Sequence, residues 1–192
     1  MKVVGFVGSP RKSGNTAAVV NEVLRGAQEA GAQISVYNLN QLNIKGCQSC
    51  YKCQTSEGRC IQKDDMQNLY DEIYSADAVV IGTPVYMMQV TGQTKLFVDR
   101  FFAFLYPADG TPGNYKNKLG GKKSVTVYTQ GQPDTSLFGS YLNQMDATLS
   151  FIGFKVQDRI TVGGNRNPDD AKKNTAAMEK AYTVGATLVK EG

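Results

Sequence analysis

Histidine is the most informative absence from this 192-residue sequence. Without histidine, the chain cannot form a serine–histidine–aspartate or cysteine–histidine catalytic arrangement, and it cannot bind zinc through imidazole. Tryptophan is absent as well, so a flat aromatic ligand would have to pack against tyrosine, phenylalanine or methionine. These absences disfavour the common hydrolases and leave chemistry that requires no histidine acid or base.

Long apolar runs are also missing. No stretch approaches the roughly 18 apolar residues that span a membrane, and the N-terminus, MKVVGFVGSP, is too short and lacks the cleavage site of a signal peptide. Lysines and arginines are scattered and the net charge is only +4, so no nucleic-acid-binding surface is indicated. We therefore expect a cytoplasmic protein without a membrane or nucleic-acid partner, folded as a single domain over residues 1–192.

Cysteine is scarce but concentrated. All four cysteines lie in the segment GCQSCYKCQTSEGRC, in the pattern Cys-x2-Cys-x2-Cys-x6-Cys, as Cys47, Cys50, Cys53 and Cys60. Clustered thiols in a reducing compartment are typical of metal or redox sites, and this short spacing lets the sulfurs turn inward around a compact core, which favours an iron–sulfur cluster. A structural zinc site and free or disulfide-bonded thiols stay open as alternatives.

Strand-like and helix-like patterns alternate along the chain. Strands are expected at 2–8, 33–39, 77–83, 122–129 and 155–162, and helices at 16–30, 66–75 (capped by Asp64 and Asp65), 94–104, 136–152 and 167–190. This alternation predicts an α/β fold, a doubly wound three-layer sandwich with a five-stranded parallel sheet. In such folds, ligands bind beyond the carboxyl ends of the strands.

The loop after the first strand is a candidate phosphate site. It reads GSPRKSGNT at residues 8–16 and leads into a helix, whose N-terminus attracts anions. The candidate contacts are Ser9, Arg11, Ser13, Gly14, Asn15 and Thr16. The spacing matches neither a triphosphate loop nor a dinucleotide loop and suits a terminal monophosphate. The alternative is a polar turn that only caps a helix.

Two more loops follow neighbouring strands. The second is Thr83–Met88, in which Tyr86, Met87 and Met88 could pack on a flat aromatic ring. In the third, Gln130 and Gly131 would let the backbone approach the edge of a ligand. Each loop alone is equally consistent with ordinary packing, but three such loops at adjacent strand ends favour one shared ligand site.

With these motifs, the sequence resembles the flavodoxin-like NAD(P)H-dependent FMN reductase superfamily, and within it the iron–sulfur flavoproteins. The matching segments are GSPRKSGNT at 8–16, the cysteines at 47–60, KDDM at 63–66, GTPVY at 82–86 and QTKLFVDR at 93–100. The resemblance implies strand order 2-1-3-4-5 and a 4Fe–4S cluster held by the four cysteines on a loop at 46–62. It also implies FMN held by the three loops, with the flavin ring against Pro84, Val85, Tyr86 and Met87 and its edge near Gln130 and Gly131. A homodimer or homotetramer is implied as well.

The function implied by this resemblance is that of an FMN-dependent oxidoreductase passing electrons between the cluster and FMN. The donor would be ferredoxin or NAD(P)H, and the acceptor a small molecule. No catalytic side chain is expected, because the cofactors carry the chemistry. The alternatives are an NAD(P)H-dependent FMN or quinone reductase without a cluster, and a non-enzymatic flavin carrier or sensor.

Two other features of the sequence carry expectations. The apolar stretch at 101–106, FFAFLY, could be core or subunit interface, and its density of aromatic residues favours the interface. Lys95, Asp99 and Arg100 are expected on a solvated or ion-paired helix face rather than in a site.

Overall fold

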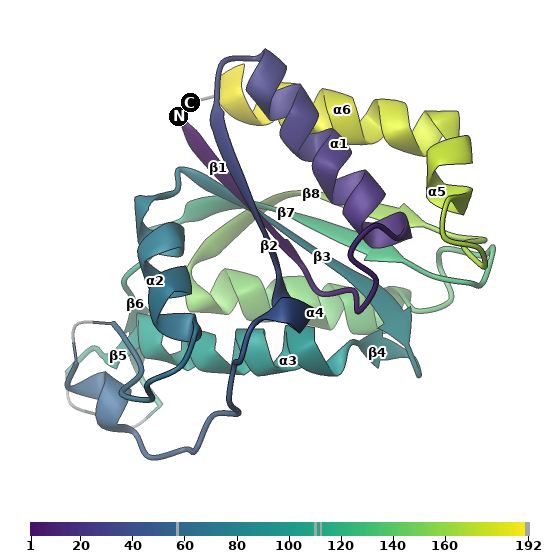
Figure 1. Ribbon diagram of the computed structural model, residues 1–192. Helices are drawn as coiled ribbons and strands as arrows, with labels where there is room; N and C mark the ends of the chain where they lie inside the picture. Colours follow the sequence, from purple (N-terminus) through teal and green to yellow (C-terminus); the bar gives the residue numbers. More distant parts are fainter. Residues whose placement is uncertain (57, 110, 112, 191–192) are drawn as a thin grey trace.

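The computed structural model describes residues 1–56, 58–109, 111 and 113–190; Glu57, within the cysteine loop, lies outside them. The central parallel sheet consists of β1 (Lys2–Val7), β2 (Gln33–Asn38), β3 (Ala78–Tyr86), β7 (Lys122–Thr129) and β8 (Phe154–Val162). Their spatial order is β2-β1-β3-β7-β8 (Figure 1), which confirms the predicted flavodoxin-like arrangement. The strands are rich in valine because helices cover both faces of the sheet.

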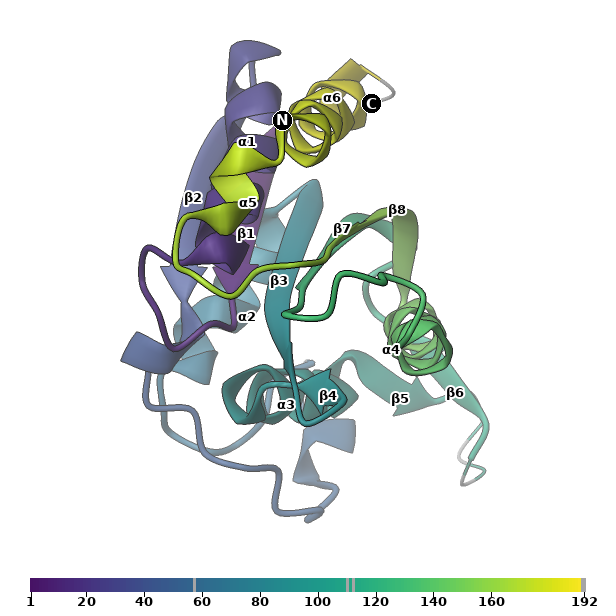
Figure 2. The same ribbon diagram turned by 90° about the vertical axis from the view of Figure 1, so that its right-hand side faces the viewer.

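Helices form a layer on each side of this sheet (Figures 1 and 2). One layer contains α1 (Asn15–Glu29), α5 (Asp170–Lys173) and α6 (Thr175–Lys190), and the other contains α2 (Met66–Ser75), α3 (Gly92–Asp99) and α4 (Gly139–Ile152). The shorter elements are β4 (Gln89–Val90), β5 (Leu105–Pro107), β6 (Tyr115–Asn117) and the 3-10 turns η1 (Leu39–Gln41), η2 (Lys52–Gln54) and η3 (Arg100–Phe104). Within the described residues, no helix is both long and apolar enough to cross a bilayer.

Three element boundaries differ from the sequence-based prediction. The helix expected at 94–104 ends at Asp99 and continues as the η3 turn. The last helix starts at Asp170, two residues after the proline, and breaks at Asn174 into α5 and α6. Strand β3 runs on to Tyr86 because it pairs with β4, so Pro84–Tyr86 belong to a strand end rather than to a loop.

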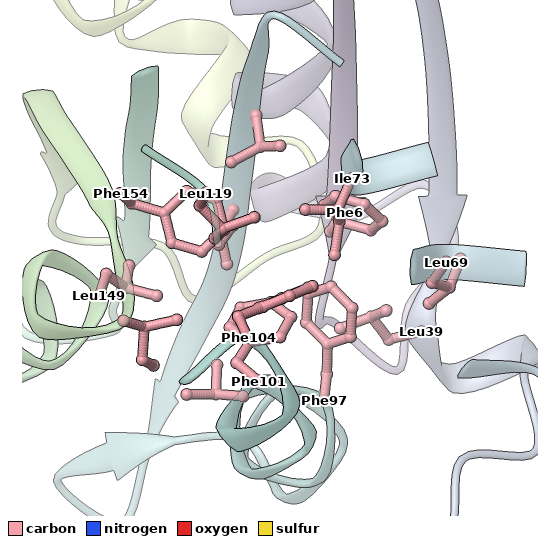
Figure 3. Close-up of a cluster of buried hydrophobic side chains, with 14 of the residues drawn as sticks. Phe6, Leu39, Leu69, Ile73, Phe97, Phe101, Phe104, Leu119, Leu149 and Phe154 are labelled. Carbon is pink, nitrogen blue, oxygen red and sulfur yellow. The ribbon is translucent and has the colours of Figure 1, made fainter. Parts of the chain in front are cut away.

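Aromatic side chains fill the core between the sheet and the α2–α3–α4 layer (Figure 3). Phe97 lies 4.8 Å from Phe6 and 4.6 Å from Phe101 between ring centroids, and Phe101 and Phe104 are both 0% exposed. The prediction of a subunit interface was therefore wrong for most of the 101–106 stretch. The η3 turn directs these side chains under the sheet, where apolar burial stabilises the fold.

Candidate functional site

A cavity of about 260 Å³ lies where β1, β3, β7 and β8 end, on the side of the molecule that faces the viewer in Figure 2. Its lining consists of Ser9, Arg11, Asn15, Thr16, Pro84, Val85, Tyr86, Thr129, Gln130, Gly131, Asn165 and Arg166. Most of the residues predicted at the three loops thus surround one cavity. Ser13, Gly14 and Met87 are not among them.

The first loop folds into a turn over the N-terminus of α1. The Ser9 Oγ accepts the Arg11 N–H at 3.1 Å, and the Gly14 N–H donates to the Arg11 carbonyl at 3.4 Å. Gly14 is the N-cap residue of α1, and a glycine has no side chain to accept the N–H groups of the first turn. These groups, with the exposed Arg11 beside them, form a setting suited to an anion.

Asn15 and Thr16 use their side chains for structural contacts. The Asn15 Nδ2 donates to the Asn167 carbonyl at 2.7 Å, and its Oδ1 accepts the Ala171 N–H at 2.9 Å. The Thr16 hydroxyl shares a 2.6 Å hydrogen bond with the Thr129 hydroxyl. Their backbone N–H groups, rather than their side chains, are therefore the groups available to a ligand.

The sequence-based analysis missed three residues of the cavity: Thr129, Asn165 and Arg166. The Asn165 Nδ2 donates to the Val162 carbonyl at 2.6 Å, which fixes the turn that brings Arg166 to the cavity. Arg166 adds a second guanidinium to that of Arg11. The available signal was the polar GGNRN segment directly after the fifth strand, because all parallel strands end at the same edge.

Gln130, which lines this cavity, carries a buried acceptor that has no partner in the described part of the chain. The residue is 2% exposed, and its Nε2 donates to the carbonyls of Gln132 at 3.2 Å and Asp134 at 2.7 Å. Its Oε1 has no hydrogen-bond partner among the described residues. A buried oxygen without a donor costs free energy, so this atom is suited to accept an N–H from a bound ligand.

Met87 and Met88 form the two-residue turn between β3 and β4. Both have left-handed φ values, +47° and +69°, as a tight hairpin requires, and they are 95% and 70% exposed. With Phe138 they line an adjoining cavity of about 380 Å³, which shares Val85, Gly131 and Arg166 with the first. Met87 therefore lies beside the first cavity rather than in its wall.

The cysteine loop is tied at both ends. The Asp64 Oδ2 accepts the Lys45 N–H at 2.9 Å, the Asp65 Oδ2 accepts the Asn43 N–H at 2.7 Å, and the Gln62 Nε2 donates to the Gly46 carbonyl at 3.0 Å. Asp64 also caps α2 by accepting the Met66 N–H at 3.2 Å. Asp65 is the N-cap residue of α2, but its side chain makes no capping hydrogen bond to a described residue, so the predicted capping is made by the Asp64 carboxylate, and the Asp65 carboxylate ties the loop instead.

Arg100 differs from its prediction as part of an exposed helix face. Lys95 and Asp99 form a surface ion pair as expected, but the ion pair of Arg100 with Asp64 is fully buried, with both side chains 0% exposed. Burial works against the charged form of Asp64, but the hydrogen bonds from Arg100 and from the Lys45 N–H outweigh it and lower the pKa of Asp64.

The four thiols are free and unevenly buried: Cys47 and Cys50 are exposed, Cys60 is partly buried and Cys53 is buried. N–H groups of Ser49, Gln54 and Gln62 donate to the sulfurs of Cys47, Cys53 and Cys60 at 3.5, 3.8 and 3.8 Å. Burial raises the pKa of Cys53, with smaller contributions from Cys60 and Cys47. Across the described residues, no three cysteine, aspartate, glutamate or histidine side chains are gathered closely enough to hold a metal ion.

Comparison with known proteins identifies the family. A profile described as NADPH-dependent FMN reductase matches residues 1–159, and an iron–sulfur flavoprotein of Archaeoglobus fulgidus is 34% identical over 90% of this chain and 75% of its own length. The chain belongs to the iron–sulfur flavoproteins of the NADPH-dependent FMN reductase family. An iron–sulfur flavoprotein of Methanocaldococcus jannaschii is 28% identical, over 96% of this chain and 94% of its own.

Solved structures of similar fold agree with this family. The NAD(P)H:quinone oxidoreductase from Methanothermobacter marburgensis superposes with a TM-score of 0.74 at 18% identity, over 98% of both chains. An azoreductase from Bacillus anthracis superposes with a TM-score of 0.72 at 17% identity, over 97% of this chain and 99% of that one. Family membership makes this protein a flavin-dependent oxidoreductase that uses FMN, which argues against the alternative of a non-enzymatic carrier.

Proposed function

We propose that this oxidoreductase passes electrons between FMN, bound in the 260 Å³ cavity, and a 4Fe–4S cluster bound by Cys47, Cys50, Cys53 and Cys60. The observation that carries the proposal is a loop of four free thiols whose two ends are tied to the body of the fold. When bound, FMN can exchange electrons singly or in pairs, whereas the cluster carries one electron at a time.

Residues in and directly beside the cavity fit FMN by their chemistry. Ser9, Arg11, Ser13 and the backbone N–H groups of Gly14, Asn15 and Thr16 would hold the phosphate at the N-terminus of α1. Pro84, Val85, Tyr86 and Met87 would border the flavin ring, and Gln130 and Gly131 would face its polar edge. The unpartnered Oε1 of Gln130 supports this placement, because a flavin ring has an N–H that needs an acceptor.

The cysteine loop fits a cluster by its donor set. Four thiolates are the usual ligands of a 4Fe–4S centre, and hydrogen bonds to the sulfurs help to set its reduction potential. Three of the four sulfurs already accept an N–H. Ser49 and Tyr51 adopt left-handed φ values of +50° and +57°, which reverse the chain between successive cysteines. Such uncommon backbone conformations are concentrated at functional sites.

Donor and assembly are part of the proposal. In Figure 1 the cysteine loop lies on the opposite side of the molecule from the β3–β4 hairpin, which borders the cavity. Electrons would therefore pass between the cavity of one copy of the chain and the cysteine loop of another copy. This supports a homodimer or homotetramer. NAD(P)H or ferredoxin would supply the electrons, and a small molecule would accept them. We further propose that residues 1–192 act as one domain.

A reductase without a cluster is the second candidate. It is favoured by the spread of the thiols, because Cys47 and Cys50 are exposed and Cys53 is buried. In this case FMN or a quinone would be reduced by NAD(P)H, and the cysteine loop would be structural or hold zinc.

The deciding experiment is an assay of iron, acid-labile sulfide, zinc and flavin on one sample of anaerobically purified protein. About four irons and about one FMN per chain, with a broad visible absorbance bleached by dithionite, is the result expected for the two-centre protein. A clean flavin spectrum with zinc or without metal would favour the reductase without a cluster. Light scattering on the same sample measures the assembly.

A further inference from the structure

Arg100 has an unusual environment for an arginine. Its side chain is 0% exposed. Its Nη1 donates to the Asp64 Oδ2 at 2.5 Å and to the Lys45 carbonyl at 2.8 Å, and its Nη2 donates to the Asp64 Oδ1 at 3.2 Å. Its Nε has no hydrogen-bond partner among the described residues. One buried guanidinium thus makes three hydrogen bonds, all from its Nη atoms, while its Nε has no partner within the described part of the chain.

The partners of Arg100 flank the cysteine loop. Lys45 precedes Cys47 by two positions, and Asp64 follows Cys60 by four, so the Arg100 side chain contacts both ends of the loop and reinforces the direct hydrogen bonds between them. The η3 turn that carries Arg100 also contacts the middle of the loop. There, the Gln54 Nε2 donates to the Phe102 carbonyl at 3.4 Å, and the Tyr51 and Phe102 rings meet edge to face at 5.8 Å.

The backbone of Arg100 is held as firmly as its side chain. The hydroxyl of the buried Tyr70 donates to the Arg100 carbonyl at 2.9 Å. Burial works to lower the pKa of Arg100, but the hydrogen bond to Asp64, together with the charges of Tyr70, Cys60 and Asp64, outweighs this effect and raises the pKa. Cys60 is therefore within electrostatic reach of the guanidinium.

Stability alone is a weak explanation for this arrangement. Desolvating an ion pair costs free energy that apolar side chains of similar volume avoid, and a buried N–H without an acceptor adds to this cost. A fixed cation with a free donor is instead suited to an anionic group nearby. In this part of the fold, the candidate anion is a centre bound by the four thiolates.

We propose that Arg100 is a positioning residue for the iron–sulfur cluster: it holds the two ends of the cysteine loop together and places a buried positive charge near the cluster sulfurs. This inference rests on the proposed two-centre function. The positive charge favours the reduced, more anionic state of the cluster and so raises its reduction potential. The tie between Lys45 and Asp64 favours cluster assembly, because it reduces the conformations open to the loop.

The test compares Asp64→Asn with the double variant Asp64→Asn/Arg100→Met, and adds Arg100→Lys. The amide introduced by Asp64→Asn keeps an acceptor for the Lys45 N–H, so the double variant removes the guanidinium without leaving a buried carboxylate unpaired. Arg159→Lys is the matched control, because Arg159 forms an ion pair with Asp146 on the α4–β8 side of the molecule. Iron, sulfide and FMN per chain are measured anaerobically, and the cluster potential by a redox titration followed by electron paramagnetic resonance.

The double variant should hold less iron than Asp64→Asn, with unchanged FMN. The equilibrium constant for one-electron reduction of its remaining cluster should be about tenfold smaller than in Asp64→Asn. This corresponds to a reduction potential lower by about 59 mV. Arg100→Lys keeps the charge but not the forked geometry, so it should hold less iron than the wild type, with a cluster potential close to that of the wild type. Arg159→Lys should match the wild type.

Two results would overturn the assignment in distinguishable ways. Wild-type protein without iron and sulfide would defeat the two-centre function, and the role of Arg100 with it. A wild-type cluster whose iron content and potential are the same in all three variants would defeat the role of Arg100 alone. If the double variant does not fold, Arg100→Lys decides: a wild-type iron content overturns the proposal, and a lower iron content supports it.

Discussion

The side-chain oxygen of Asn15 accepts the backbone N–H of Ala171 at 2.9 Å, across 156 positions of the sequence. The same amide donates to the Asn167 carbonyl at 2.7 Å. Asn15 thereby fastens the segment after β8, which carries Arg166, to the first turn of α1, which borders the cavity. The positions of the segment after β8 and of the proposed phosphate loop relative to each other thus depend on the Asn15 side chain.

Replacing Asn15 should affect both stability and flavin binding. In Asn15→Ala, the Ala171 N–H and the Asn167 carbonyl lose their partner, so we expect the free energy of unfolding to fall by about 1–3 kcal/mol. FMN should bind more weakly, because Arg166 is no longer held at the cavity. Urea unfolding of the FMN-free protein and an FMN titration measure the two effects. Asn143→Ala, which removes a partner of Arg159, should leave FMN affinity unchanged; wild-type FMN affinity in Asn15→Ala would contradict the argument.

Gly8 lies too close to α3 to carry a side chain. A Cβ at this position would lie 1.8 Å from the Thr94 Oγ1, so Gly8→Ala should destabilise the protein by about 1–3 kcal/mol through overpacking. Gly8→Ala/Thr94→Ala should recover part of the loss, which thermal or urea unfolding can measure. Gly92→Ala, whose Cβ would have no atom within 4 Å, is the control; the prediction is wrong if both glycine variants behave alike.

Arg11 should discriminate FMN from riboflavin. If its guanidinium contacts the phosphate, Arg11→Gln should weaken FMN binding about tenfold, the effect of one charge-assisted hydrogen bond, and leave riboflavin binding unchanged. Lys12→Gln removes a neighbouring exposed charge that does not line the cavity and should alter neither affinity. Fluorescence titrations with both flavins measure this, and equal losses for FMN and riboflavin would exclude a phosphate contact.

A Cys60 variant should distinguish cluster binding from FMN binding. Cys60→Ala should lose the iron and acid-labile sulfide but retain FMN, because the cysteine is not part of the cavity lining. Metal analysis and the visible spectrum of the anaerobic protein measure the outcome. Ser56→Ala, in the same loop, is the control. An unchanged iron content in Cys60→Ala would remove this residue from the ligand set.

Asp64 should contribute to the acid sensitivity of the fold. Its pKa is lowered in the folded protein, since Arg100 and the Lys45 N–H outweigh the effect of burial. The stability that it provides is therefore fully present above the unfolded-state pKa of about 3.9 and is lost as the pH falls through the lower folded-state value. Asp64→Asn should flatten the acid limb of unfolding free energy against pH, measured by urea unfolding of the cofactor-free protein. Asp99→Asn, in a surface ion pair, should leave that limb as it is in the wild type.

Local patterns in the sequence were sufficient to predict the sheet and the place of the cavity at the strand ends. Valine-rich runs specify buried parallel strands, because a strand covered on both faces is apolar throughout. The loop after β1 could be predicted to line the cavity from its glycine and its position before a helix, since both properties are local. The spacing of the four cysteines likewise predicts soft-metal chemistry without knowledge of the fold.

Contacts between segments far apart in the chain could be learned only from the tertiary structure. Aromatic residues such as Phe101 and Phe104 suit a subunit interface as well as a core. Their burial under the sheet follows from the η3 turn, which continues the chain after α3. The local sequence around Asn15 does not indicate whether its side chain would contact a phosphate or, as in the structure, the Ala171 N–H. The sequence predicts Arg100 at the end of an exposed helix, whereas in the structure its side chain is buried between Lys45 and Asp64. Short-range periodicity and spacing are properties of neighbouring residues, whereas these partners are selected by the packing of the whole chain.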